Sequence, residues 1–269
     1  MIEPCPLCNS LISNEHLKTG TSRLLQCSSC GLVVTEDAGA GERLYESDEY
    51  FVEKHGYVEK WDEFCRLFDT LLDKVIRYKS GGSFLDVGCG VGCLVSCAAE
   101  RGFSAQGVEV SKWAATFARE AKHLNVTTGT LEESLYDPGS FDVVIINHVL
   151  EHVPDPAGLL CEARRILKDD GLLVVGVPNI GSIMARLARA EWASLRPEEH
   201  RWHFTPDTIK SLMAKTGFRC IRFEAKDNYP VIGWGLKPML RRLINWFAVV
   251  SDYGEAMLVF AVKADGDSL

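Results

Sequence analysis

Short apolar runs alternate with amphipathic stretches along the chain from residue 83 onward. Apolar runs of about four to eight residues are typical of strands buried on both faces, whereas apolar positions that recur every third or fourth residue indicate helices. The alternation predicts an α/β fold in which helices cover both faces of a doubly wound, mostly parallel sheet. We expect its seven strands at residues 83–87, 104–109, 126–128, 141–147, 171–177, 218–223 and 256–262.

Helices are predicted between these strands and ahead of the first one. Apolar residues at helical spacing occupy residues 57–78. Asp155 with Pro156, and Thr205 with Pro206, each combine a helix-capping side chain with a proline suited to the first turn. We therefore expect one long amphipathic helix before the sheet and two capped helices in the second half of the chain.

Four cysteines near the N-terminus form two C-x-x-C pairs separated by 18 residues. Two tight turns at this spacing can present four thiolates tetrahedrally to zinc, with no position left open for a substrate. Free thiols or a redox pair are the alternatives. The pattern favours a structural zinc site formed by Cys5, Cys8, Cys27 and Cys30.

Composition restricts the partners of the protein. The formal charge of −8 gives no overall attraction to a phosphate backbone, so nucleic acid is an unfavoured partner. We find no apolar run of the roughly 20 residues that a membrane span needs, and the N-terminus lacks the basic and apolar regions of a signal peptide. Paired N-terminal cysteines together with scattered apolar ones favour a reducing compartment. We expect a cytoplasmic protein without a membrane span.

A glycine-rich loop follows the first predicted strand of the sheet, in the segment Asp86-Val87-Gly88-Cys89-Gly90. Glycines permit close approach of the backbone to a ligand. A carboxylate beside the loop would repel a pyrophosphate but suits a ligand that carries an ammonium and a sulfonium. Glu109 ends the next strand, where an acid can accept hydrogen bonds from both ribose hydroxyls. The two acids predict one nucleoside ligand.

Residues 82–179 resemble the class I S-adenosylmethionine-dependent methyltransferases. The glycine loop is similar to the first motif of that family, and the segment from Phe141 to His148, followed by Val149-Leu150-Glu151-His152, is similar to its fourth-strand motif. The resemblance implies a seven-stranded fold and S-adenosylmethionine as cofactor. It implies cofactor contacts from Asp86, Gly88, Gly90, Glu109, Val110, Thr130, Leu131, Asn147 and His148.

The whole chain resembles a bacterial subset of this family that carries an N-terminal zinc ribbon and includes many sugar and natural-product enzymes. The resemblance implies a small-molecule acceptor and an aromatic cover over the cofactor at Tyr45, Tyr50 and Phe51. It implies a zinc ribbon at 1–42, a helical linker and cofactor lid at 43–80, and a methyltransferase domain at 81–269, with substrate-lid segments at about 180–204 and 228–253.

Histidines are the candidate general bases, because an imidazole with an ordinary pKa can accept a proton near neutral pH. The resemblance places His200 over the mouth of the active site, so His200 is the first candidate and His152 the second, with helix capping as the alternative role for His152. Packing in the cofactor pocket is favoured for His148. Solvation is the alternative for His200 and His203, and the acids Glu151, Glu198 and Glu199 are expected to be exposed charges.

Two other functions fit parts of the sequence. The ribbon could dock an RNA or protein substrate, but residues 1–42 contain Lys18 and Arg23 against five acids. A non-catalytic cofactor-binding protein is the second alternative. A helical apolar stripe at residues 236–250 is expected to pack in the core or cover the substrate, rather than lie on a membrane surface.

Overall fold

The structure is a computed structural model that describes residues 4–20, 22–36, 49–54, 56–226, 239, 248 and 253–264. Tyr45 and nearly all of the predicted segment 228–253 lie outside the described residues. The chain divides into two compact units. The first unit contains residues 1–39, 148–157 and 175–260, and the second contains residues 40–147, 158–174 and 261–269.

The strands of the larger sheet are the ones that the sequence pattern predicts, with small differences at their ends. The sheet has seven strands, which lie in the order β10-β11-β8-β7-β4-β5-β6. Strand β4 pairs in parallel with β5 and β7, and β5 pairs in parallel with β6. The α/β fold class is thereby confirmed. The strands are β4 (Gly82–Val87), β5 (Phe103–Glu109), β6 (Val126–Thr128), β7 (Phe141–Asn147), β8 (Leu167–Pro178), β10 (Phe218–Lys226) and β11 (Ala256–Lys263).

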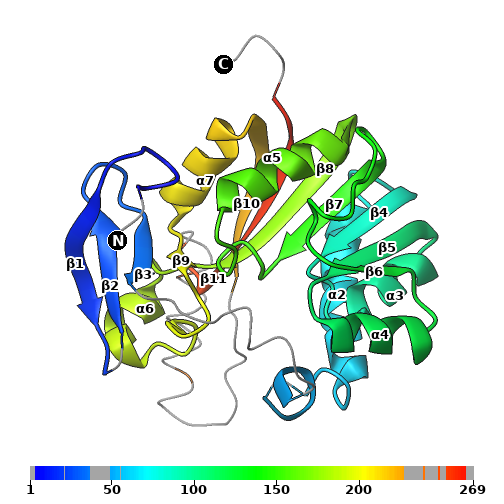
Figure 1. Cartoon of the computed structure of the whole chain (residues 1–269), viewed down its shortest axis with the longest axis horizontal. Coiled ribbons are helices and arrows are strands. Elements are labelled where there is room, and N and C mark those ends of the chain that lie inside the picture. The colour runs from blue at the N-terminus through cyan, green and yellow to red at the C-terminus, as the bar shows by residue number, and fades with distance from the viewer. Residues whose placement is uncertain are drawn as a thin grey trace. The chain divides into compact units, whose positions relative to one another are not determined.

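Helices of the second unit cover strands β4, β5 and β6 (Figure 1). Strand β5 packs closely against the glycine loop, because a Cβ atom added to Gly107 would lie 2.4 Å from the sulfur of Cys89. The fully buried Phe84 contributes to the core from β4. The helical segments are η1 (Tyr50–Lys54), α2 (Trp61–Val75), α3 (Cys93–Glu100), α4 (Lys112–Glu120) and α5 (Pro156–Ile166).

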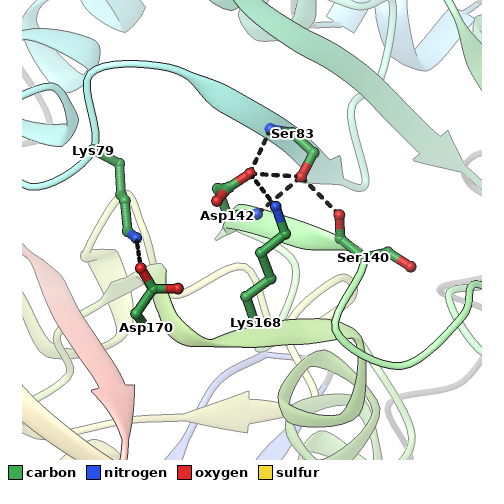
Figure 2. Close-up of polar contacts among 6 residues, drawn as sticks. All are labelled: Lys79, Ser83, Ser140, Asp142, Lys168 and Asp170. Carbon is green, nitrogen blue, oxygen red and sulfur yellow. Dashed lines mark hydrogen bonds and ion pairs between the residues drawn. The ribbon is translucent and has the colours of Figure 1, made fainter.

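A polar network joins the amino-terminal ends of three strands of the second unit (Figure 2). Asp142, in β7, accepts hydrogen bonds from the amide and hydroxyl of Ser83 at 2.8 and 2.9 Å, and from the ammonium of Lys168 at 2.8 Å. Lys79 donates to Asp170 at 2.7 Å beside it. Ligands of parallel sheets bind at the opposite, carboxyl ends of the strands, so this network is structural.

The first unit contains a small antiparallel sheet with the strand order β1-β2-β3-β9. Strands β1 (Ile12–Lys18), β2 (Arg23–Cys27) and β3 (Val33–Glu36) come from the cysteine-rich segment, and β9 (Trp202–His203) joins them from far along the chain. Leu24 and Val33 are fully buried there with Trp192 and Leu195. The cysteine-rich segment therefore shares its apolar core with the later segment.

Capped helices complete the first unit. Thr205 caps α7 (Pro206–Lys215) in a reciprocal capping box with Thr208, so the expected cap is confirmed. Ser182 caps α6 (Ile183–Ala188), which is followed by the short helix η2 (Arg189–Glu191). Among the described residues no helix is both long and apolar enough to cross a membrane.

Candidate active site

The glycine loop connects β4 to α3 in a conformation that requires glycine. Gly88, Gly90 and Gly92 have φ angles of 70°, 54° and 91°, in the left-handed region that side chains disfavour. A Cβ atom added to Gly90 would lie 3.5 Å from the ring of Phe51, which places that aromatic residue against the loop. The loop leaves its backbone accessible, as close approach of a ligand demands.

Glu109 is fixed beside this loop by two backbone amides. Its Oε2 accepts from the amide of Gly90 and its Oε1 from the amide of Ser111, both at 2.8 Å. Burial raises the pKa of Glu109 although both hydrogen bonds favour its ionised form. Each carboxylate oxygen keeps a second lone pair, so the group can also accept hydrogen bonds from two neighbouring hydroxyls. The geometry suits a ribose.

Asp86 lies at the carboxyl end of β4 and is 5% exposed. Burial, and next the charge of Glu109, raise the pKa of Asp86 well above its usual range. A buried acid in this position is stabilised in its ionised form by a cationic ligand. The ammonium and sulfonium groups of S-adenosylmethionine supply that charge, so the residues present fit the cofactor implied by the sequence.

The other predicted cofactor residues also follow carboxyl ends of strands. Thr130 and Glu133 exchange hydrogen bonds between side chain and backbone, and Leu131 beside them is buried. Val110 follows β5 and is half exposed. Asn147 ends β7, and its buried Oδ1 has no hydrogen-bond partner among the described residues. A buried acceptor left in this state is a good site for a ligand donor.

Two segments of the first unit, residues 148–152 and 199–203, assemble a cluster of histidines. The carbonyl oxygen of Glu151 accepts hydrogen bonds from the amides of Arg201 and Trp202 at 2.9 and 3.0 Å. His152 Nδ1 lies 2.9 Å from the carbonyl oxygen of Glu199, which can only accept, so this nitrogen carries a proton. The rings of His152 and His200 meet edge to face at 4.8 Å between centroids.

Glu151 provides the negative charge of this cluster. Its side chain is 1% exposed, and Oε1 lies 3.2 Å from His148 Nδ1. Burial opposes ionisation, but the hydrogen bond to His148, and the charges of the surrounding histidines when these are protonated, outweigh it and lower the pKa of Glu151 to about 2. Glu151 is therefore a carboxylate at neutral pH, and it stabilises a proton gained by a neighbouring histidine.

Burial lowers the pKa of His200 well below its usual value, although the charge of Glu151 opposes this shift. His200 is consequently neutral, with a lone pair that can accept a proton. Burial also lowers the pKa of His203 to about 3. His148, at the start of the cluster, has a φ of 57°, rare for a residue with a side chain. Such strain is typical of functional sites.

The structure differs from the sequence expectation at the acids of this cluster. Glu151 and Glu199 were expected to be exposed, yet they are 1% and 3% exposed. His200 and His203 are likewise buried, which overturns the solvated alternative. Charged partners explain the difference, because His148 and His152 face Glu151 Oε1, and the guanidinium of Arg196 lies 3.6 Å from Glu199 Oε2. A signal was present, since four of the seven histidines of the chain fall in these two short segments.

The four N-terminal cysteines converge on one another in the first unit. The sulfur pairs Cys5–Cys30 and Cys8–Cys27 are 3.4 Å apart, and all four sulfur atoms lie within 4.8 Å of one another. Tetrahedral zinc with bonds of about 2.3 Å would separate its sulfur ligands by about 3.8 Å. The residues present fit a zinc ion.

Each cysteine pair is followed by a residue in the left-handed conformation. These residues are Asn9, with a φ of 59°, and Gly31, with a φ of 80°. The amide of each donates to the carbonyl oxygen of the first cysteine of its pair, at 2.8 and 2.9 Å. The two turns therefore repeat one geometry, which is the arrangement expected of paired metal-binding knuckles.

Comparison with known proteins agrees with the geometry of the glycine loop. Residues 57–222, more than half of the chain, match the family described as a methyltransferase domain. A ubiquinone biosynthesis O-methyltransferase from Glaesserella parasuis is 33% identical over 153 residues, which are 49% of this chain and 65% of that protein. The chain thus spans slightly less than two thirds of that relative.

A second relative with the same description, from a Caulobacter species, is 34% identical over 171 residues, covering 56% of this chain and 68% of that protein. A crystal structure from Thermotoga maritima, described as an S-adenosylmethionine-dependent methyltransferase and possible histamine N-methyltransferase, superposes with a TM-score of 0.57. It is 25% identical and covers 80% of this chain and 98% of its own. The chain belongs to the class I S-adenosylmethionine-dependent methyltransferases.

Proposed function

We propose that the protein transfers a methyl group from S-adenosylmethionine to a hydroxyl oxygen of a small-molecule acceptor, with His200 as general base. The observation that carries the proposal is the buried cluster of His200, His152 and the ionised Glu151. The relatives named as ubiquinone O-methyltransferases support oxygen as the methylated atom. A sugar, a natural product or a related metabolite is the acceptor class.

Asp86, Glu109 and the glycine loop would hold the cofactor, which supplies an electrophilic methyl group on sulfur when it is bound. The acceptor oxygen forms its bond to the methyl carbon as the carbon–sulfur bond breaks, and the sulfur keeps that electron pair. The proton of the hydroxyl passes to His200 and then to solvent. The products are a methyl ether, S-adenosylhomocysteine and one proton.

His200 suits the base role because of its surroundings. Its burial keeps it neutral before the reaction but weakens it as a base, and the nearby carboxylate of Glu151 offsets this by stabilising the imidazolium that forms on proton transfer. His152 is the second candidate. The proton on its Nδ1 leaves the lone pair of the neutral ring on Nε2, which lies 4.0 Å from Glu151 Oε1.

We also propose that Cys5, Cys8, Cys27 and Cys30 hold a structural zinc ion. When bound, zinc would link the two knuckles of a segment that shares its apolar core with Trp192 and Leu195. The acidic balance of residues 1–42 disfavours a docking role toward RNA.

The acceptor can be found by incubating the protein with a metabolite extract and cofactor that carries a labelled methyl group, followed by mass spectrometry. With that acceptor and saturating cofactor, His200→Gln should lower turnover by roughly a hundredfold, while calorimetry shows unchanged cofactor affinity. Near-normal turnover would exclude His200 as the base, and a parallel His152→Gln variant would then test the second candidate. Absence of labelled product from every extract tried would favour a non-catalytic role.

A further inference from the structure

The strand β3 of the cysteine-rich segment meets the segment that carries His200. Val33 pairs with His203 and Val34 with Trp202 in antiparallel register. The amide of Thr35 donates to the carbonyl oxygen of Arg201 at 2.9 Å, which extends the contact by one residue. A strand edge that would otherwise present unpaired amides and carbonyls is thereby covered by β9.

Thr35 is 3% exposed, and its hydroxyl contacts two residues of the proposed base segment. The hydroxyl donates to the carbonyl oxygen of His200 at 2.8 Å. Its oxygen also lies 2.8 Å from His203 Nε2. A threonine hydroxyl has a single proton, and the carbonyl oxygen of His200 can only accept it. His203 Nε2 must therefore carry a hydrogen and donate it to Thr35.

We propose that Thr35 is a positioning residue for the base, through which the zinc ribbon sets the backbone of His200 and the tautomer of His203. This inference rests on the proposed function. It assigns the ribbon a role inside the methyl-transfer machinery instead of a docking role.

Several contacts make the position of His200 sensitive to Thr35. The amide of His200 donates to the carbonyl oxygen of Arg196 at 2.8 Å, so its peptide groups are held from both sides. The rings of His200 and His203 lie 6.2 Å apart between centroids. A shift of the peptide by a fraction of an ångström moves the ring relative to Glu151 and to an acceptor, and such misplacement is costly for a reaction that depends on orientation.

The metal site connects to Thr35 through a short stretch of backbone. The amide of Cys27 donates to the carbonyl oxygen of Leu32 at 2.8 Å, and β3 begins at the next residue, Val33. The second knuckle therefore sets where β3 starts and which residue faces the histidines. On the other knuckle, Lys215 of α7 donates to the carbonyl oxygens of Pro6 and Leu7 at 2.7 and 3.1 Å.

Thr35→Val keeps the shape of the side chain and removes the hydroxyl, while Thr35→Ser keeps the hydroxyl. NMR of the protein labelled with ¹⁵N in its histidine rings gives chemical shifts that report the tautomer of each histidine. This measurement needs no acceptor. In Thr35→Val we expect His203 to lose its single Nε2-protonated form, and in Thr35→Ser to retain it. Unchanged His203 signals in Thr35→Val overturn the proposal, whatever the reaction is. Thr35→Ala replaces Thr35→Val if the valine variant does not fold.

Turnover provides the second measurement once an acceptor is known. We expect Thr35→Val to lower kcat about tenfold, with unchanged cofactor affinity and zinc content, and Thr35→Ser to restore most of it. Equal turnover in Thr35→Val and Thr35→Ser contradicts the positioning role even if the tautomer of His203 changes. Failure of the proposed base is distinguishable, because it shows in His200→Gln while the ¹⁵N signals of His203 still report on Thr35.

Discussion

The pKa values of two buried glutamates of this protein are shifted in opposite directions. Glu109, at the end of β5, is 5% exposed and has a raised pKa, whereas Glu151, four residues after β7, is 1% exposed and has a pKa lowered to about 2. Glu109 receives backbone amides, and Glu151 is surrounded by imidazoles. The partners, rather than the extent of burial, decide whether a buried carboxylate stays ionised.

The difference corresponds to two kinds of chemistry. Glu109 and Asp86 form an acidic site that is stabilised when a cationic ligand with hydroxyls arrives from outside. Glu151 is already ionised, and in the proposed mechanism it stabilises a cation that forms on the protein itself, on His200 or His152. A methyltransferase needs both, because it binds a sulfonium and, for a hydroxyl acceptor, must also receive a proton.

Loss of zinc should give the largest difference between the two regions, with a large loss of turnover and little change in cofactor affinity. Cys27→Ser is expected to remove one equivalent of metal and lower turnover at least a hundredfold, because β3 loses its anchor, while cofactor affinity changes less than about threefold. Elemental analysis, calorimetry and turnover of the same preparations test this. Cys161→Ser, at an exposed cysteine far along the chain, is the matched control.

The number of metal equivalents bound per chain also tests whether the histidine cluster acts as a base or binds a metal ion. Ligand atoms of Glu151, His152 and His200 lie within 4.8 Å of one another, a spacing that a divalent cation could use. The base proposal predicts one equivalent of metal in the unmodified protein and none in Cys27→Ser. A second equivalent that persists in Cys27→Ser and disappears in His152→Gln would contradict the role of these histidines as bases.

Replacing Glu151 by glutamine should affect the histidine region alone. Glu151→Gln removes the charge that stabilises the imidazolium, so we expect turnover to fall about fiftyfold with unchanged cofactor affinity. Kinetics at saturating cofactor measure the loss. Weakened cofactor binding with normal turnover would reverse the division of roles between Glu151 and Glu109.

Substitutions in the cofactor region should give the converse result. Glu109→Ala and Asp86→Ala each remove a hydrogen-bonding anion, and we expect each to weaken S-adenosylmethionine binding about thirtyfold while the fold is retained. Turnover at saturating cofactor should change much less. Isothermal calorimetry supplies the affinities, and equal affinity in both variants and the unmodified protein would refute the assignment.

Local patterns were sufficient to predict most of the fold. β6 and β7 begin and end where predicted, and in β7 five of the seven residues are buried. β8 begins four residues earlier than predicted and includes the charged residues Lys168, Asp169 and Asp170 near its start. Asp142, Lys263 and Lys79 pair with those three residues from elsewhere in the chain.

The histidine cluster could be predicted only in part, because it depends on pairing between distant segments. His152 and His200 were identified as candidates, but nothing near residue 202 indicates a strand until β3 is placed beside it. In the sequence, nothing distinguishes Thr35 from any other threonine of a strand. Its role follows from contacts with His200 and His203, which are 165 and 168 residues away in the sequence.

A third acid, Asp142, provides the smallest expected effect and a control for the comparison. It lies at the amino end of β7, where burial opposes ionisation but hydrogen bonds from Lys168 and Ser83 lower its pKa to about 2. Because the folded pKa is below the ordinary value of 3.8, these contacts stabilise the protein above about pH 4. The stabilisation is lost as the pH falls from about 4 toward 2.

Asp142→Asn should therefore lower the free energy of unfolding at pH 6 by about 1 kcal/mol, allowing for screening of the partly exposed Lys168, and by progressively less below pH 4. Urea unfolding of both proteins at pH 6, 4 and 3 measures the difference. Asp170→Asn, in an ion pair whose carboxylate side chain is 81% exposed, should change stability little. Turnover and cofactor affinity should be unaffected in both variants, since this end of the sheet is opposite the one where ligands of parallel sheets bind. A loss of turnover in Asp142→Asn under conditions where the variant is still folded would mean that the charge at this end of β7 influences the reacting groups.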